Sequence, residues 1–278
     1  MSTCGTLYVV ATPLGNLGDF TPRAAEVLSK VACIAAEDTR HSGKLMRHFG
    51  IDTGLQALHE HNERSHAEAL LDRLERGDDI ALISDAGTPL ISDPGFRLVR
   101  GARERGIEVV AVPGPCAAIA ALSVAGLACD RFVFEGFLPA KGAARRERIR
   151  ALRDETRTLI FYESPHRIEA MLADLASELG GGRHAVLARE LTKAFETVLD
   201  ASLDGLIERL AEDPNQRRGE MVVLVAGAEA VVEGDEAAAR RVLEVLLPRL
   251  APREAAAAAA ELTGLPRNRL YRMAMEGK

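Results

Sequence analysis

Short apolar runs alternate with longer amphipathic segments through the first two-fifths of the chain. The runs predict buried strands at residues 6–11, 33–36, 80–84 and 108–112. The segments between and beside them predict helices at residues 21–31, 42–49, 65–76 and 94–105. Strands that alternate with helices usually form a parallel sheet covered on both faces. We therefore expect an α/β domain over residues 1–115.

Individual residues suggest where some of these helices begin and end. Ser65 and Glu68 have the spacing of a capping box. Asp93 and Pro94 are suited to the N-cap and first position of the helix that follows. Gly77 and Gly106 are expected to end the helices that precede them.

The pattern breaks at Pro113-Gly114-Pro115, where we place a hinge. An apolar helix at 116–125 then leads into a second set of elements. Strands are expected at 132–135, 158–162, 185–188 and 221–225, and helices at 145–153, 165–179 and 202–211. These elements predict a second α/β domain over residues 116–228.

The last segment, residues 234–278, differs in character. It predicts an amphipathic helix at 236–250, an alanine-rich helix at 252–262 and a tight turn at Thr263-Gly264-Leu265. An arginine-rich helix then opens at Pro266. This layout is typical of a helix-turn-helix, and it also fits an ordinary helical hairpin packed on the body.

The loop after the strand at 80–84 carries the strongest functional signal. Ligands bind at the carboxyl ends of strands in open α/β sheets. Asp85 provides a carboxylate there, and Ala86, Gly87 and Thr88 are small enough for a ligand to approach the backbone. A P-loop and a dinucleotide fingerprint are both absent from the sequence.

Composition narrows the class of protein. The chain has 278 residues, is 47% hydrophobic and has a formal net charge of -6, enough apolar material for two cores. With neither a secretory leader nor an apolar run long enough to cross a bilayer, we expect a cytoplasmic protein without a membrane partner. The four cysteines show no disulfide or CxxC spacing, so reduced and mostly buried thiols are expected.

Two basic segments stand out against the acidic total. The first contains Lys141, Arg145, Arg146, Arg148, Arg150, Arg153 and Arg157, and the second contains Arg267, Arg269 and Arg272. Each is compatible with a nucleic-acid contact and with a solvated helix face.

Taken together, the segments at 10–19, 36–40, 84–95, 113–117, 134–139, 161–167, 189–193 and 218–220 resemble the tetrapyrrole methylase superfamily. The similarity is greatest to its branch of ribosomal RNA small-subunit methyltransferases, which 2'-O-methylate a cytidine in the decoding region. Tetrapyrrole-modifying members usually have Gly-Asp-Pro where this chain has Ser84-Asp85-Ala86. That departure favours the RNA-modifying branch.

The resemblance implies two α/β domains with a cleft between them that holds S-adenosylmethionine, followed here by the small helical region. It also implies a homodimer. The family's cofactor contacts fall on Pro13, Leu14, Gly15, Asp85, Ala86, Gly87, Thr88, Cys116, Ala117 and Tyr162.

Methyl transfer to a ribose hydroxyl depends on alignment and on a group that takes the proton. We expect Asp38, Arg40, Glu190 and Lys193 to line the acceptor side of the cleft because they lie at predicted strand ends. Glu37 and Glu163 are further candidates. Each of these carboxylates is also compatible with a structural ion pair to Arg40, Arg167 or Arg189.

Histidines give a weaker signal. His59-Glu60-His61, with Glu63 nearby, suggests a metal site, but a polar or substrate-facing surface is the preferred interpretation, so no metal is expected. His166 either contacts substrate or caps a helix.

The expected function is S-adenosylmethionine-dependent 2'-O-methylation of a cytidine in 16S ribosomal RNA, with the small ribosomal subunit as partner. The alternatives are a small-molecule methyltransferase of the tetrapyrrole type and a non-catalytic RNA-binding protein.

Overall fold

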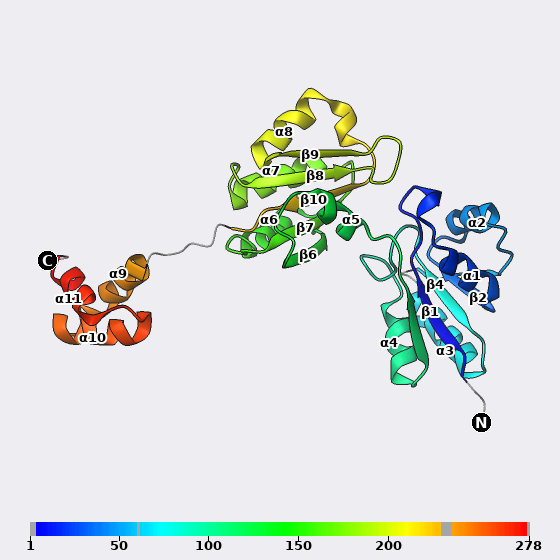
Figure 1. Ribbon diagram of the computed structural model, residues 1–278, viewed down its shortest axis with the longest axis horizontal. Coiled ribbons are helices and arrows are strands. Elements are labelled where there is room, and N and C mark those ends of the chain that lie inside the picture. Colours follow the sequence, from blue (N-terminus) through cyan, green and yellow to red (C-terminus); the bar gives the residue numbers. More distant parts are fainter. Residues whose placement is uncertain (1–3, 60–61, 229–234, 277–278) are drawn as a thin grey trace. The chain divides into compact units, whose positions relative to one another are not determined.

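The computed structural model describes residues 4–59, 62–228 and 235–276. Its chain forms two compact units, Met1–Gly227 and Ala228–Lys278. The first unit contains two five-stranded sheets, one in the blue-to-green part of the ribbon and one in the green-to-gold part (Figure 1). The predicted α/β architecture with two sheets is confirmed.

The first sheet is wholly parallel, with the order β3-β2-β4-β1-β5. Its strands are β1 (Thr6–Val10), β2 (Cys33–Ala36), β3 (Leu55–Ala57), β4 (Ile80–Ile83) and β5 (Glu108–Val112). Every residue of β2 and β4 is buried, because helices cover both faces of the sheet. The short strand β3 escaped prediction, since three residues carry too little periodicity to recognise.

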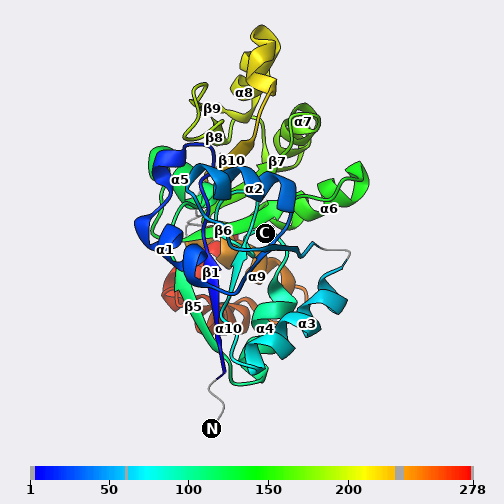
Figure 2. The same ribbon diagram turned by 90° about the vertical axis from the view of Figure 1, so that its right-hand side faces the viewer.

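Four helices cover this sheet: α1 (Pro22–Lys30), α2 (Thr39–His48), α3 (Glu63–Glu75) and α4 (Phe96–Glu104). Strand β4 shows how the faces divide. Ile80 and Leu82 pack into the core formed with α3 and α4, whereas Ala81 and Ile83 pack into the core formed with α1 and α2. Figure 2 shows α3 and α4 lying side by side along the sheet.

Two predicted helix caps were wrong. Asn62 is the N-cap of α3, and Ser65 lies inside the helix with its hydroxyl donating to the Asn62 carbonyl. Helix α4 begins after Gly95, where the Glu63 carboxylate accepts hydrogen bonds from the Gly95 and Arg97 backbone N–H groups at 3.1 and 2.8 Å. A side chain from another helix therefore caps α4, and a local pattern cannot reveal it.

The second sheet has the order β6-β7-β10-β8-β9. Its strands are β6 (Phe132–Phe137), β7 (Thr158–Glu163), β8 (His184–Arg189), β9 (Thr197–Ser202) and β10 (Met221–Val225). Only β6 and β7 pair in parallel, and the other neighbours are antiparallel. Strand β9, at the edge, was not predicted.

Helices α5 (Ala117–Val124), α6 (Gly142–Ala151), α7 (Ile168–Leu179) and α8 (Leu203–Glu212) cover the second sheet. Strand β10 is last in the chain but central in the sheet, and it is buried throughout. Val222 and Leu224 pack towards α5, and Met221, Val223 and Val225 pack towards the other three helices.

The basic segment on α6 is largely neutralised. Arg145 and Arg146 contact Asp174, at 2.7 and 3.4 Å, and further arginines of this helix pair with carboxylates of β6 and α7. This arrangement fits the solvated helix face better than a nucleic-acid contact.

The C-terminal unit consists of α9 (Asp235–Leu246), α10 (Pro252–Thr263) and α11 (Arg267–Glu276). Its core uses small residues, since Ala255, Ala256 and Ala259 of α10 are buried against Leu243 and Leu270. Gly264 ends α10 in the left-handed region at φ 71°, as expected for a C-terminal glycine cap.

All four thiols are free, but the prediction that most are buried was wrong, because Cys4 and Cys129 are exposed. Among the helices of the described ranges, none combines the length and apolar character needed to cross a bilayer.

Candidate active site

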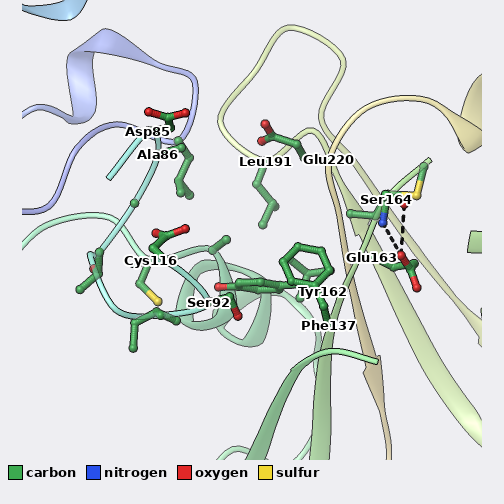
Figure 3. A pocket seen from close by; sticks show the side chains of 18 of the residues that line it. Asp85, Ala86, Ser92, Cys116, Phe137, Tyr162, Glu163, Ser164, Leu191 and Glu220 are labelled. Carbon is green, nitrogen blue, oxygen red and sulfur yellow. Dashed lines mark hydrogen bonds between the residues drawn. The ribbon is translucent and has the colours of Figure 1, made fainter. Parts of the chain in front are cut away.

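A cavity of about 390 Å³ lies between the loops of the first sheet and the face of the second. We call it the first cavity. The loop after β4 supplies one wall, from Asp85 to Asp93, and Leu191, Glu220 and Val222 belong to the other. Figure 3 shows Asp85 and Ala86 on the side opposite Leu191 and Glu220. Its volume lies within the roughly 300–1,000 Å³ typical of small-molecule sites.

The loop after β4 is fastened to the loop after β1. Thr12 and Gly87 exchange backbone hydrogen bonds of 2.9 and 3.0 Å, and the Thr12 hydroxyl donates to the Ser84 carbonyl. Gly87 has a φ of +84°, and a Cβ there would lie 3.1 Å from the Leu14 side chain. The bend therefore requires glycine, and it leaves bare backbone at the cavity wall.

The same loop holds backbone strain. Leu90 and Ser92 adopt left-handed φ angles of 73° and 68°, a conformation that costs about 1–3 kcal/mol for each residue that is not glycine. Ser92 lines the first cavity, and Gly136 of β6 lies against its hydroxyl. Strain of this kind concentrates at ligand sites, where the surroundings hold the backbone in place.

The second domain contributes an aromatic floor. The Tyr162 hydroxyl accepts a hydrogen bond of 3.0 Å from the Ala118 backbone at the start of α5. The rings of Phe134 and Phe137 meet Tyr162 edge-on, with centroids 5.1 and 5.7 Å away. Burial is the main reason that the pKa of Tyr162 is raised, so Tyr162 stays protonated and acts as a packing and hydrogen-bonding group.

The first cavity is acidic. Five carboxylates line it, from Glu37, Asp85, Asp93, Glu163 and Glu220, and the described lining includes no Lys, Arg or His. Burial, reinforced by neighbouring carboxylates, raises the pKa of Glu37 to about 7. Burial likewise raises the pKa of Asp93 to about 6. A cavity with this lining is suited to a positively charged ligand.

A second cavity of about 600 Å³ adjoins the first. The two share Leu14, Asp85, Ala86 and Glu220. Unlike the first, the second cavity is lined by basic side chains, namely His41, Lys44, His48 and Lys193.

Lys193 links the two domains at the second cavity. Its ammonium lies 3.0 Å from both Glu190 and Glu220, and a Cβ on Gly15 would come within 2.4 Å of its side chain. Partial burial acts to lower the pKa of Lys193, but the two carboxylates outweigh it and raise the pKa. Lys193 therefore carries a positive charge at the cavity wall.

Glu190 is held within the same cluster. It accepts hydrogen bonds from Lys193 and from the Glu220 backbone, at 3.0 and 2.9 Å. Burial acts to raise the pKa of Glu190, but these bonds lower it overall. Glu190 and Thr192 are also left-handed, with φ angles of 51° and 68°, so this loop too is held in a strained conformation.

The structure places the predicted cofactor residues around these cavities. Eight of them line the first cavity: Leu14, Asp85, Ala86, Gly87, Thr88, Cys116, Ala117 and Tyr162. Pro13 and Gly15 line the second cavity. Whether they bind a cofactor stays a prediction.

The four predicted catalytic residues fall in two groups. Glu190 and Lys193 are in contact, whereas Asp38 and Arg40 pair with each other at the start of α2, 3.0 Å apart. The hydrogen bonds from Arg40 lower the pKa of Asp38 to about 2. Of the four, only Lys193 lines a cavity; Asp38, Arg40 and Glu190 line neither. The Asp38 backbone N–H donates to Asp85 at 3.1 Å.

Comparison with known proteins identifies the family. A family model described as Tetrapyrrole (Corrin/Porphyrin) Methylases matches residues 6–207. The chain belongs to this family. A second model, the RsmI C-terminal HTH domain, matches residues 233–278, so the C-terminal unit of this tetrapyrrole methylase is a helix-turn-helix domain.

Similar curated proteins extend over nearly the whole chain. A Pseudomonas aeruginosa protein named Ribosomal RNA small subunit methyltransferase I is 60% identical over 99% of this chain and 98% of its own length. Proteins of the same name from Escherichia coli O157:H7 and Synechocystis are 56% and 48% identical, over 98% of this chain and 95% and 98% of theirs.

Solved structures with the same fold are more distant. Diphthine synthase has a TM-score of 0.61 at 15% identity, covering 80% of this chain and 90% of that one. Cobalt precorrin-4 methyltransferase has a TM-score of 0.57 at 14% identity, covering 80% and 94%. These matches show that the methylase fold is shared.

Several residues that line the cavities were not predicted. Phe137, Leu191 and Val222 line the first cavity but resemble ordinary strand or loop residues in the sequence. Asp93 was expected to cap a helix and instead faces the cavity. Glu220 lies in a segment that matched the family, yet nothing in the sequence marked it as shared by both cavities.

The remaining histidine predictions concern His59-Glu60-His61 and His166. Glu60 and His61 lie outside the described residues, and within the described ranges no group of three His, Cys, Asp or Glu is arranged to hold a metal ion. His166 is exposed in the turn between β7 and α7, so its suggested substrate contact stays a prediction.

Proposed function

We propose that this protein transfers a methyl group from S-adenosylmethionine to the ribose 2'-hydroxyl of a cytidine in the decoding region of 16S ribosomal RNA. One observation carries the proposal: an acidic cavity suited to a cationic donor shares its wall with a basic cavity suited to RNA. The near full-length similarity to proteins named Ribosomal RNA small subunit methyltransferase I supports RNA over a tetrapyrrole as substrate.

The residues of the first cavity fit the donor. S-adenosylmethionine carries sulfonium and ammonium charges, a single carboxylate and an adenine ring, so its net charge is positive. Asp85, Asp93 and Glu37 offer carboxylates, Gly87 and Ala117 leave room at the backbone, and Tyr162 offers an aromatic surface. The absence of Lys, Arg and His from the described lining disfavours a donor that is recognised through phosphate groups.

When bound, the donor supplies an electrophilic methyl group whose sulfur leaves as a neutral thioether. The protein's main task is therefore alignment, which brings the ribose oxygen within roughly 3–3.5 Å of the methyl carbon. The wall shared by the two cavities, formed by Leu14, Asp85, Ala86 and Glu220, is where donor and acceptor would meet.

Among the predicted catalytic residues, Lys193 has the clearest role in this proposal. Lys193 lines the acceptor cavity, and its ammonium stabilises the negative charge that builds up on the ribose oxygen as the hydroxyl proton leaves, before that oxygen bonds to the methyl carbon. The hydroxyl proton passes to Glu220, a carboxylate that lines both cavities and lies 3.0 Å from Lys193. Glu190 accepts a hydrogen bond from Lys193 and holds this side chain in place. The lowered pKa of Glu190 makes it a poor base, so we do not assign the proton to it.

In this proposal Asp38 and Arg40 do not contact the reacting groups but hold the neighbouring chain in place. Asp38 accepts the Arg40 backbone N–H at 2.8 Å and so caps α2. Its own N–H holds Asp85. The pair connects the start of α2 to the wall that the cavities share.

A direct test uses small ribosomal subunits from cells that lack this protein. Purified enzyme and S-adenosylmethionine should add one methyl group, which nuclease digestion and mass mapping should locate on a cytidine ribose of 16S RNA. The control is the same reaction with Asp85→Ala, which we expect to bind the donor weakly. Transfer to a porphyrinogen with no transfer to subunits would refute the proposal.

We also propose the homodimer that the family resemblance implies. Apolar side chains of α5 and β6 remain exposed, with Ile119 and Val124 each 51% exposed and Phe132 38%. A two-fold contact would bury them, and sedimentation at several concentrations measures it. A ribosomal substrate is consistent with the predicted cytoplasmic location.

A further inference from the structure

Helix α2 is strongly basic in a chain whose net charge is -6. Its ten residues include no Asp or Glu and contain Arg40, His41, Lys44, Arg47 and His48. None of these except Arg40 belonged to either basic segment or to any site predicted from the sequence. The helix borders the second cavity, which makes its charge relevant to the acceptor.

Three of the five basic residues of α2 share a face. His41, Lys44 and His48 follow helical spacing, are exposed, and line the second cavity together. On the opposite side of the helix Met46 is buried in the core of the domain. The core thus fixes the helix so that its basic face points to the cavity.

These charges have few partners inside the protein. In the described ranges no ion pair involves His41, Lys44, Arg47 or His48, and the Arg47 guanidinium donates to a backbone carbonyl of its own helix. Helix α6 differs, because Arg148 and Arg150 each make two hydrogen bonds to one glutamate. The charge on α2 remains available to a ligand, whereas that on α6 is already compensated.

We infer that the face of α2 formed by His41, Lys44 and His48 binds backbone phosphates of the RNA strand beside the methylated nucleotide. This inference rests on the proposed function, to which it adds the surface that holds the substrate. A lysine ammonium and imidazole N–H groups are suitable phosphate donors.

Geometry relates this face to the reaction. The second cavity is bounded by the face of α2 and by Lys193, and it reaches the first cavity through Leu14, Asp85, Ala86 and Glu220. A strand whose phosphates lie on α2 would place a neighbouring ribose at that shared wall. Such a strand must be unpaired, because a ribose inside a duplex cannot enter a cavity without leaving the stack.

The test compares a triple variant and a double variant of the full-length protein. His41→Ala/Lys44→Ala/His48→Ala removes the face at exposed helical positions, where alanine favours the helix. Arg148→Ala/Arg150→Ala removes two charges from α6 as the matched control. Binding to a single-stranded RNA fragment that contains the target cytidine is measured at several salt concentrations, together with KM for small subunits.

We expect the α2 variant to raise KM by about tenfold or more and to flatten the log–log salt dependence by about 0.7 for each phosphate that the variant no longer binds. The kcat and the affinity for S-adenosylmethionine should stay within about twofold, since the face does not line the first cavity. The α6 variant should keep the wild-type slope and KM. Lys44→Arg should retain most of the binding, because it preserves the charge.

The outcomes separate this inference from the proposed function. An α2 variant that is folded, binds donor, and keeps both the wild-type salt slope and KM overturns the inference while leaving methylation intact. If the wild-type protein binds RNA, the α2 variant weakens that binding and no methyl group is transferred, the proposed function is refuted. The inference that α2 binds RNA phosphates is then supported.

Discussion

The proposed binding of S-adenosylmethionine in the acidic first cavity predicts that donor affinity depends on pH. The pKa of Glu37 is raised from 4.5 to about 7 by burial and by its neighbours Asp93, Asp85 and Asp38. Near pH 6 most of the free protein is therefore protonated at Glu37. A cation that enters the cavity favours the ionised carboxylate, so its binding should release a proton and strengthen as pH rises.

The magnitude follows from how far the donor lowers that pKa. When the bound donor lowers the pKa of Glu37 by one unit, binding at pH 5.5 is about sevenfold weaker than at pH 8. When the donor lowers this pKa fully to 4.5, binding at pH 5.5 is about 30-fold weaker than at pH 8. At pH 6, donor binding should release roughly 0.4 protons from Glu37 when its pKa falls by one unit, and roughly 0.9 protons when its pKa falls to 4.5. Asp93, whose pKa is raised to about 6, acts in the same direction at lower pH.

Titration calorimetry in two buffers of different ionisation enthalpy measures both the affinity and the proton release. Glu37→Gln should bind more weakly at pH 8 and show a flatter profile, with a residual slope from Asp93. S-adenosylhomocysteine, which lacks the sulfonium charge, should release fewer protons. A dissociation constant that varies less than twofold between pH 5.5 and 8, or an unchanged profile in Glu37→Gln, would refute the reasoning.

Three further predictions concern single positions. Gly87→Ala should weaken donor binding about tenfold or more, because φ is +84° and the new methyl group would lie 3.1 Å from Leu14; calorimetry checks this. Asp174→Ala should lower the free energy of unfolding by about 3–5 kcal/mol in urea denaturation, since it leaves the buried Arg145 unpaired. Lys193→Met should slow single-turnover methylation by about 10²–10³-fold with little change in donor affinity.

Each of these predictions has a matched control. Gly106 is also left-handed, with φ 70°, and an added Cβ there would have no other atom within 4 Å. Gly106→Ala should therefore lower stability without changing donor affinity. Glu178→Ala removes the partner of the exposed Arg150 and should change stability by about 1 kcal/mol or less. Lys30→Met removes a surface lysine of α1 and should leave turnover unchanged. Equal effects in a variant and its control would count against the stated mechanism.

Much of the fold is predictable because its signals are local. The runs at β2, β4, β5 and β10 are apolar and bounded by turn residues, so their positions follow from the sequence alone. The edge strand β9 (Thr197–Ser202) is half exposed and mixed in composition. Its identity as a strand comes from pairing with β8, a contact that the sequence does not display.

The candidate site likewise contains residues that the sequence identifies and residues that only the folded structure reveals. Asp85 and Gly87 are recognisable because a strand, a bend and small residues occur together in one segment. The sequence does not mark Glu220, because its contact with Lys193 and its place beside Asp85 of the first domain arise only in the folded protein. The basic face of α2 is not recognisable in the sequence, because arginine, lysine and histidine on a short helix are common on any surface. Only the cavity beside them distinguishes this helix.

Strand β10 has a consequence for synthesis of the protein. It is the last strand to be made, yet it lies between β7 and β8 at the centre of the second sheet, and its Met221 and Val222 line the first cavity. A growing chain that stops before this strand has a gap in that sheet and an incomplete wall. Prematurely terminated products should therefore be inert, and the ability to take up the methyl donor should emerge in one step late in translation.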